Sequence, residues 1–105
     1  MTQTNVSMDN CGFQTVIEAE SADDGKIKLK ISSDCEGVQK LAEELQAVDP
    51  MELIGQEIGN SVVHQAACKR LRHIGCIVPV ATIRTIEVEV GFALPGESTV
   101  SIKKM

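Results

Sequence analysis

The alternation of apolar and polar residues is strongest in the first third of the chain. FQTVIEAE (13–20) and KIKLKIS (26–32) each place every second side chain on one face, the period of a β-strand. The segment between them, SADDG, is a turn sequence, because Asp tolerates left-handed backbone conformations and Gly25 adopts a positive φ without strain. The pattern therefore predicts a β-hairpin whose turn is centred near residue 23.

Helical spacing replaces the alternation after residue 33. In SSDCEGVQKLAEELQAVDP the apolar residues recur every three or four positions, and the Ser33–Glu36 spacing matches a capping box, with Asp34 as an alternative N-cap. Pro50 ends this helix and suits the first turn of a short helix over 51–59. A further helix is predicted over about 61–73, with Asn60 or Ser61 as its cap.

The last third of the chain contains one ambiguous segment. PVATIRTIEVEVG (79–91) is rich in β-branched residues and its propensity favours a strand, yet its apolar positions also fit a helix that Pro79 opens and Gly91 closes. The closing STVSIKK alternates at Val100 and Ile102 and predicts a final strand. The expected fold class is α+β: an N-terminal β-hairpin, three to four helices and a C-terminal strand that completes a small sheet. Residues 1–105 are expected to form a single domain, with 1–10 as a flexible N-terminal arm.

Composition limits the classes of function. The net charge is −5, Trp and Tyr are absent, and the only basic cluster is Lys69, Arg70 and Arg72 with His73. A nucleic-acid surface needs clustered cations and aromatic stacking groups, so we read this cluster as a solvated helix face and expect no nucleic-acid partner. No apolar run approaches the roughly 20 residues of a membrane span, and MTQTNVSMDN lacks the features of a secretory signal. We expect a cytoplasmic protein without membrane association.

The candidate chemistry lies in four cysteines, none of which forms a CxxC pair. Cys11 and Cys35 are equidistant from the expected turn centre, so antiparallel pairing would bring them side by side at the open end of the hairpin. Cys68 lies on the helix over 61–73, and Cys76 follows the end of that helix. In a reducing compartment, metal binding or catalysis is a more common role for such residues than a disulfide. The leading hypothesis is a four-thiolate metal site, Cys11, Cys35, Cys68 and Cys76, that holds zinc or an iron–sulfur cluster.

Other interpretations of these cysteines stay open. Cys35 is expected in the first turn of a helix, where the helix dipole stabilises a thiolate, so the protein could be a thiol redox enzyme or sensor with Cys11 as the resolving thiol. The two could instead form a disulfide, or all four cysteines could simply pack in the core of an interaction module. His64 and His73 could support a ligand. A protein or redox partner is compatible with each interpretation, and the sequence does not indicate an oligomeric state.

The sequence resembles an uncharacterised family of small four-cysteine proteins from anaerobic archaea and bacteria. The motifs are CGF at 11–13, SDC at 33–35, the helical Cys68, HIGCIVP at 73–79 and IEVEVGFALP at 86–95. The departures, Val90 and Phe92 in the last motif and Gly96-Glu97 after it, touch no cysteine. The resemblance implies a shared role for the four cysteines and a helix over residues 80–90. It implies no activity.

Overall fold

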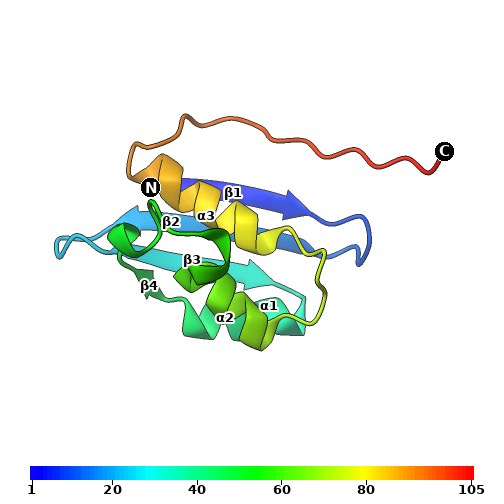
Figure 1. Cartoon of the computed structure of the whole chain (residues 1–105), viewed down its shortest axis with the longest axis horizontal. Coiled ribbons are helices and arrows are strands. Elements are labelled where there is room, and N and C mark those ends of the chain that lie inside the picture. The colour runs from blue at the N-terminus through cyan, green and yellow to red at the C-terminus, as the bar shows by residue number, and fades with distance from the viewer.

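A four-stranded antiparallel sheet with helices on one face forms the body of the protein (Figure 1). A computed structural model describes all residues, 1–105. The strands, in the sheet order β1-β2-β3-β4, are β1 Thr2–Ser7, β2 Gln14–Ser21, β3 Ile27–Ser33 and β4 Ala47–Val48. The helices are α1 Glu36–Glu44, α2 Val62–Arg70 and α3 Val78–Glu89, with short 3₁₀ turns η1 Pro50–Glu52 and η2 Ile58–Asn60 before α2. The α+β class predicted from the sequence is confirmed.

The helices divide the inner face of the sheet between them. The α3 helix packs on β1 and β2, α1 packs on β3, and α2 contacts both of these helices (Figure 1). Burial alternates along β2 and β3, so Ile17 and its partner Ile31 point toward the helices while Glu18 and its partner Lys30 point to solvent. The core that results is aliphatic, and its buried polar side chains all have hydrogen-bond partners.

The predicted β-hairpin is present as β2 and β3, but its register is shifted. Thr15 pairs with Ser33, which centres the turn on residue 24, one residue later than the sequence analysis expects. Gly25 has a φ of 84°, and the Asp24 carboxylate accepts a hydrogen bond from the backbone of Lys26 at 3.0 Å. These turn contacts set the register, because the side-chain pattern alone tolerates a turn of slightly different length.

The ambiguous segment 79–91 is helical, against its β-propensity. Pro79 lies in the first turn of α3, where its missing N–H costs nothing. Thr82 and Thr85 are buried, and their hydroxyls donate to the carbonyls of Val78 and Ala81 one turn earlier. Burial of this face against β1 and β2 outweighs the intrinsic preference of β-branched residues for strands.

The other helices differ in detail from the sequence predictions. The N-cap of α1 is Cys35, while the Ser33 hydroxyl accepts from the Cys35 backbone N–H at 3.1 Å. Ser61 caps α2 as predicted, by accepting from the His64 backbone N–H at 2.9 Å. The α2 helix ends at Arg70, three residues before the expected limit of 73. Residues 51–59 contain only the ends of the two 3₁₀ turns and not a continuous helix.

Both ends of the chain differ in structure from the sequence predictions. Residues 2–7, expected within a flexible arm, form strand β1, because Val6 is buried and the Thr4 hydroxyl is hydrogen-bonded to the Thr85 hydroxyl of α3 at 2.6 Å. The predicted C-terminal strand does not form. Residues 92–105 lack regular structure and extend away from the body, since β1 already occupies the position beside β2 (Figure 1).

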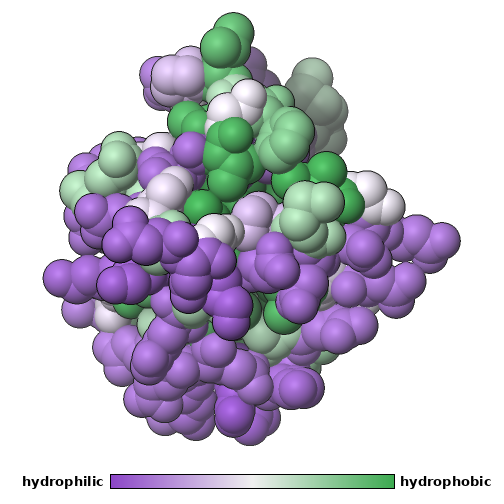
Figure 2. Space-filling model, turned by 90° about the vertical axis from the view of Figure 1, so that its left-hand side faces the viewer, coloured by the Kyte–Doolittle hydropathy of each residue, from purple (hydrophilic) through white to green (hydrophobic).

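The C-terminal segment leaves apolar side chains in solvent. The exposed ones are Phe92, Leu94, Val100 and Ile102. Figure 2 shows hydrophobic residues gathered over the upper part of one end of the molecule, above a hydrophilic lower part. None of the helices has the length and apolar character needed to span a membrane.

Candidate thiol site

The four cysteines are all free thiols and lie on four different segments. Cys11 is in the loop between β1 and β2, Cys35 is the N-cap of α1, Cys68 is in α2, and Cys76 lies two residues before α3. Cys11 and Cys68 are exposed, while Cys35 and Cys76 are partly buried against the core. Simple core packing therefore does not account for the full set.

Chain topology brings three of these segments to one end of the sheet. The strands β1 and β3 run in the same direction, so the loop that follows β1 and the junction that follows β3 lie at the same end, and α3 begins there too (Figure 1). The Asn10 side-chain amide and the His73 Nε2 are 3.0 Å apart, which joins the loop carrying Cys11 to the segment that precedes Cys76.

The pKa of the Cys76 thiol is raised by its surroundings. Burial raises the pKa of the Cys76 thiol, a hydrogen bond from the Val78 backbone N–H opposes this increase, and negative charge on Cys35 and Cys11 raises the pKa further. The segments that carry Cys11 and Cys35 meet the start of α3 at one end of the sheet, and negative charge there disfavours the Cys76 thiolate. Cys11, Cys35 and Cys76 form the group that we call the three-thiol group.

The pairing inside this group differs from the sequence prediction. With the hairpin centred on residue 24, the β2–β3 pairing ends at Thr15 and Ser33, so Cys11 and Cys35 do not face each other across strands. Gly12 has a φ of 72° and donates to the Met8 carbonyl at 3.0 Å, so Cys11 lies in a tight loop and not on a strand. Cys11 lies at this end of the fold in the loop between β1 and β2, and Cys35 lies at the same end as the N-cap of α1.

A cavity of about 400 Å³ lies beside two of the thiols. It is formed by the start of α1 and the segment 70–76 that follows α2, and Gly37 allows these to meet closely: a Cβ there would lie 3.2 Å from the Arg70 carbonyl oxygen. Its lining residues are Cys35, Glu36, Gly37, Lys40, Arg70, Leu71, Arg72, His73 and Cys76. Thiols and cations thus share one concave surface in a chain whose net charge is −5.

The cations of this cavity are only partly neutralised by the protein. Lys40 lies 3.5 Å from a carboxylate oxygen of Glu36, and the Arg70 Nε lies 3.6 Å from a carboxylate oxygen of Glu44. Arg72 makes no ion pair. The sequence predicts a solvated helix face for Lys69, Arg70, Arg72 and His73, whereas Arg70, Arg72 and His73 line the cavity.

Cys68 is not a member of the three-thiol group. It is on the exposed side of α2, opposite the buried Val63, Ala66 and Ala67, and it neither lines the cavity nor perturbs Cys76. No set of three or more Cys, His, Asp or Glu side chains stands in an arrangement that could hold a metal ion. The convergence of all four cysteines is therefore absent from this structure.

The two histidines have different surroundings. The His64 Nδ1 is 2.9 Å from the Ser61 hydroxyl, so its ring takes part in the cap of α2. His73 lines the cavity. Only His73 is placed to support chemistry at the thiols.

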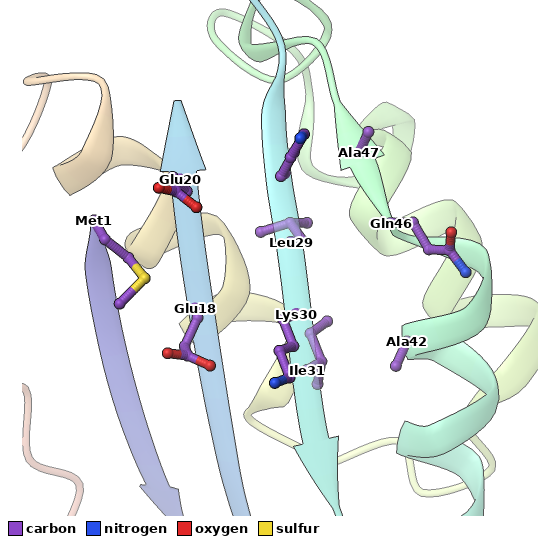
Figure 3. A pocket seen from close by; sticks show the side chains of 10 residues that line it. Met1, Glu18, Glu20, Leu29, Lys30, Ile31, Ala42, Gln46 and Ala47 are labelled. Atoms are coloured by element: carbon purple, nitrogen blue, oxygen red, sulfur yellow. The ribbon is translucent and has the colours of Figure 1, made fainter. Parts of the chain in front are cut away.

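A second hollow, of about 820 Å³, extends from Met1 and β2 across β3 to α1 and β4 and carries no thiol or imidazole (Figure 3). Its charged residues come from the solvent face of β2 and β3, where Glu18 is paired with Lys30 and Glu20 with Lys28. Opposite charges directly across a sheet stabilise it modestly, so these charged side chains have a structural role.

Glu89 is a structural residue that nothing in the sequence pattern singles out. Its carboxylate accepts from the Thr2 hydroxyl at 2.8 Å, and from the Ser21 backbone N–H and hydroxyl at 3.0 and 2.9 Å. Glu89 therefore fastens the end of α3 to β1 and β2. The position of a hydroxyl partner 87 residues away gives no local signal in the sequence.

Comparison with known proteins gives one match. The model described as a family of unknown function (DUF6951) matches residues 2–102. No curated protein and no solved structure matches the chain.

Proposed function

We propose that this chain, which belongs to the DUF6951 family of unknown function, is a cytoplasmic metal-binding protein that uses the three-thiol group, Cys11, Cys35 and Cys76, as ligands for zinc or an iron–sulfur cluster. The proposal is supported by the chain topology, which brings the three segments that carry these cysteines to one end of the sheet. No metal specificity follows from the family.

The electrostatics of the group favours a cation. Partial burial disfavours the Cys76 thiolate, and negative charge on Cys35 and Cys11 disfavours it further. A soft metal ion removes both penalties, because it deprotonates a coordinating thiol and places a positive charge among the sulfurs. Zinc and iron–sulfur centres are the usual partners of thiolate sets in proteins.

Binding requires the thiols to draw closer than they stand in this structure. Zn–S bonds are about 2.3 Å long. Cys11 is the natural mobile ligand, because it is exposed and its loop residues Met8 and Gly12 are held by a single turn of backbone hydrogen bonds. The metal would then fasten the β1–β2 loop to the starts of α1 and α3, so its binding would add to the free energy of unfolding.

The test is metal content after anaerobic purification, with variants Cys11→Ser, Cys35→Ser and Cys76→Ser and the matched control Cys68→Ser. We expect a stoichiometric metal in the wild-type protein and in the control, and its loss in the other three variants. Because Trp and Tyr are absent, a cluster would dominate the absorption spectrum, whereas zinc would leave the protein colourless. Wild-type protein that stays metal-free after anaerobic reconstitution with iron and sulfide, and with zinc, contradicts the proposal.

A thiol redox function is the second candidate, supported by the position of Cys35 at the N-cap of α1 with Cys11 at the same end. The Cys35 thiolate would attack a substrate disulfide, releasing one substrate thiol. Cys11 would then displace the second thiol and leave a Cys11–Cys35 disulfide, so the substrate is reduced by two electrons. Quantitative formation of that disulfide on titration with oxidised glutathione, in metal-free protein, would favour this candidate; mixed disulfides with unresolved Cys35 would exclude it.

A further inference from the structure

We propose that Cys35 is a modification site, at which a small disulfide that carries carboxylate groups forms a mixed disulfide with the protein, and that the cations of the adjoining cavity recognise those carboxylates. No bound metal is needed for this reaction. It rests only on the first step of the second candidate function, the attack of Cys35 on a disulfide, and it adds the chemical class of the substrate.

The cavity places this thiol and several cations on one concave surface. Cys35 lines it together with Lys40, Arg70 and Arg72. Glu36 supplies the single carboxylate among the lining side chains, so positive charge prevails there, although the whole chain carries a net charge of −5. The first turn of α1 also lines the cavity, and the first N–H groups of a helix have no acceptor within it. An anionic molecule is therefore favoured at this thiol over a neutral or cationic one.

Arg72 is the cation that can meet a ligand without breaking an existing contact. Lys40 lies 3.5 Å from a carboxylate oxygen of Glu36, and Arg70 lies 3.6 Å from one of Glu44, so part of their charge is neutralised within the protein. Arg72 follows the end of α2 and makes no ion pair. Its guanidinium group presents N–H donors in a planar fork that matches the two oxygens of a carboxylate.

Cys35 differs from the other thiols in its surroundings. Cys76 also lines the cavity, but its sulfur accepts a hydrogen bond from the Val78 backbone N–H. The Cys35 side chain makes no hydrogen bond in the cap of α1. Cys11 and Cys68 are exposed and lie outside the cavity. Cys35 is thus the thiol that combines access to the cavity with a sulfur that has no partner in the cap.

The reaction is one step of thiol–disulfide exchange. The Cys35 thiolate attacks one sulfur of the small disulfide, a new S–S bond forms to Cys35, and the S–S bond of the small molecule breaks. One half of the small molecule stays attached to Cys35, and the other half leaves as a thiolate and takes up a proton from water. The small disulfide is itself the oxidant, so no further electron acceptor is required.

The size of the cavity limits the substrate. A volume of about 400 Å³ lies at the small end of the range for small-molecule sites, roughly 300–1,000 Å³. One carboxylate-bearing half of a small disulfide fits this space. We therefore assign the site to a small-molecule disulfide and not to a disulfide of a folded protein.

The experiment compares two disulfides of similar size on reduced, metal-free protein at one pH and one ionic strength. Dithiodiglycolate carries two carboxylates, whereas bis(2-hydroxyethyl) disulfide is neutral. Samples are quenched with acid, the remaining thiols are alkylated, and the rate at which each free thiol is lost is read by peptide mass spectrometry. Loss of the free Cys35 thiol is common to a mixed disulfide that persists and to one that Cys11 converts to a Cys11–Cys35 disulfide, so this rate does not depend on Cys11.

With dithiodiglycolate, we expect Cys35 to react before Cys76 and Cys68. Arg72→Gln should slow the loss of Cys35 about tenfold, the factor that corresponds to the lower end of the range for a hydrogen bond to a charged group. The same variant should leave the reaction with the neutral disulfide unchanged, because that molecule has no carboxylate for Arg72 to bind. Arg84→Gln, which removes an exposed arginine from α3, is the matched control and should react as the wild type does with both disulfides.

Equal rates in Arg72→Gln and Arg84→Gln would overturn the proposal, and so would loss of Cys76 or Cys68 before Cys35. Equal slowing of both disulfides in Arg72→Gln would show that Arg72 acts on the thiol and not on the carboxylate, and would overturn the recognition. A mixed disulfide that persists in the wild-type protein would exclude the two-thiol redox function and leave the modification site standing. Protein that takes up no metal would contradict the metal-binding function alone.

Discussion

Removing the Glu89 carboxylate should destabilise the fold in a way that depends on pH. Its side chain is only 11% exposed and accepts three hydrogen bonds from Thr2 and Ser21, and the N-terminal ammonium lies 3.6 Å away. A hydrogen bond to a charged group contributes about 1.5–3 kcal/mol. Because the donors lie near the surface and water can replace part of the loss, we expect Glu89→Ala to lower the free energy of unfolding by about 2 kcal/mol in total.

The pH dependence follows from the same contacts. The hydrogen bond from Thr2 is the largest influence that lowers the pKa of Glu89 below its ordinary value of 4.5; burial opposes it, and the Ser21 hydrogen bonds and the N-terminal charge add to the decrease. A carboxyl with a lowered pKa in the folded state contributes stability above its unfolded pKa, and this contribution is lost as the pH falls through the folded value. The difference between wild type and Glu89→Ala should therefore be full at pH 7 and shrink below pH 4.5.

Urea unfolding followed by far-ultraviolet circular dichroism is the suitable assay, because the absence of Trp and Tyr removes the usual fluorescence probes. Glu87→Ala is the matched control, since its carboxylate makes no hydrogen bond or ion pair in the structure. A Glu89→Ala variant as stable as Glu87→Ala at pH 7, or a deficit that is the same at pH 7 and pH 3, would refute the reasoning.

Three further predictions concern the fold. Leu41 is fully buried between α1 and the sheet, so Leu41→Ala should cost about 2–5 kcal/mol in urea unfolding, and a cost below about 1 kcal/mol would mean that the core is loosely packed. Gly25→Ala should cost about 1 kcal/mol in the same assay, because a φ of 84° is unfavourable for a residue with a Cβ; an equally stable variant would contradict the assigned turn. Removal of residues 96–105 should change the midpoint of thermal unfolding by no more than about 2 °C, because these residues have no regular structure and are exposed; a larger decrease would show that the segment packs.

The sequence predicts the elements whose side-chain pattern is strong. The β2–β3 hairpin follows from strict alternation, and α1 follows from its apolar spacing. Strand β1 was missed because its inward residues Thr2 and Thr4 are polar, and their partners, Glu89 and Thr85, come from the other end of the chain. The C-terminal strand was expected because STVSI alternates, but alternation does not say whether a sheet edge is available.

The sequence indicates where three of the four cysteines lie in the fold, but not the position of Cys68 or the cavity. These three thiols could be placed at one end of the fold from the hairpin and the helix boundaries, although the turn centre was off by one residue. The position of Cys68 depends on which side of α2 is buried, and the short α2 helix, with buried Val63 and Ala66, turns Cys68 outward. The cavity forms because α2 ends at Arg70 and residues 70–76 leave the helix, whereas the sequence pattern predicts a helix that continues to residue 73.

The most direct test of the thiol centre is X-ray absorption at the edge of the bound metal, recorded on anaerobically purified protein. The account predicts sulfur neighbours at about 2.3 Å from the metal in the wild-type protein, and the same number in Cys68→Ser. A coordination shell of nitrogen and oxygen atoms alone would contradict it.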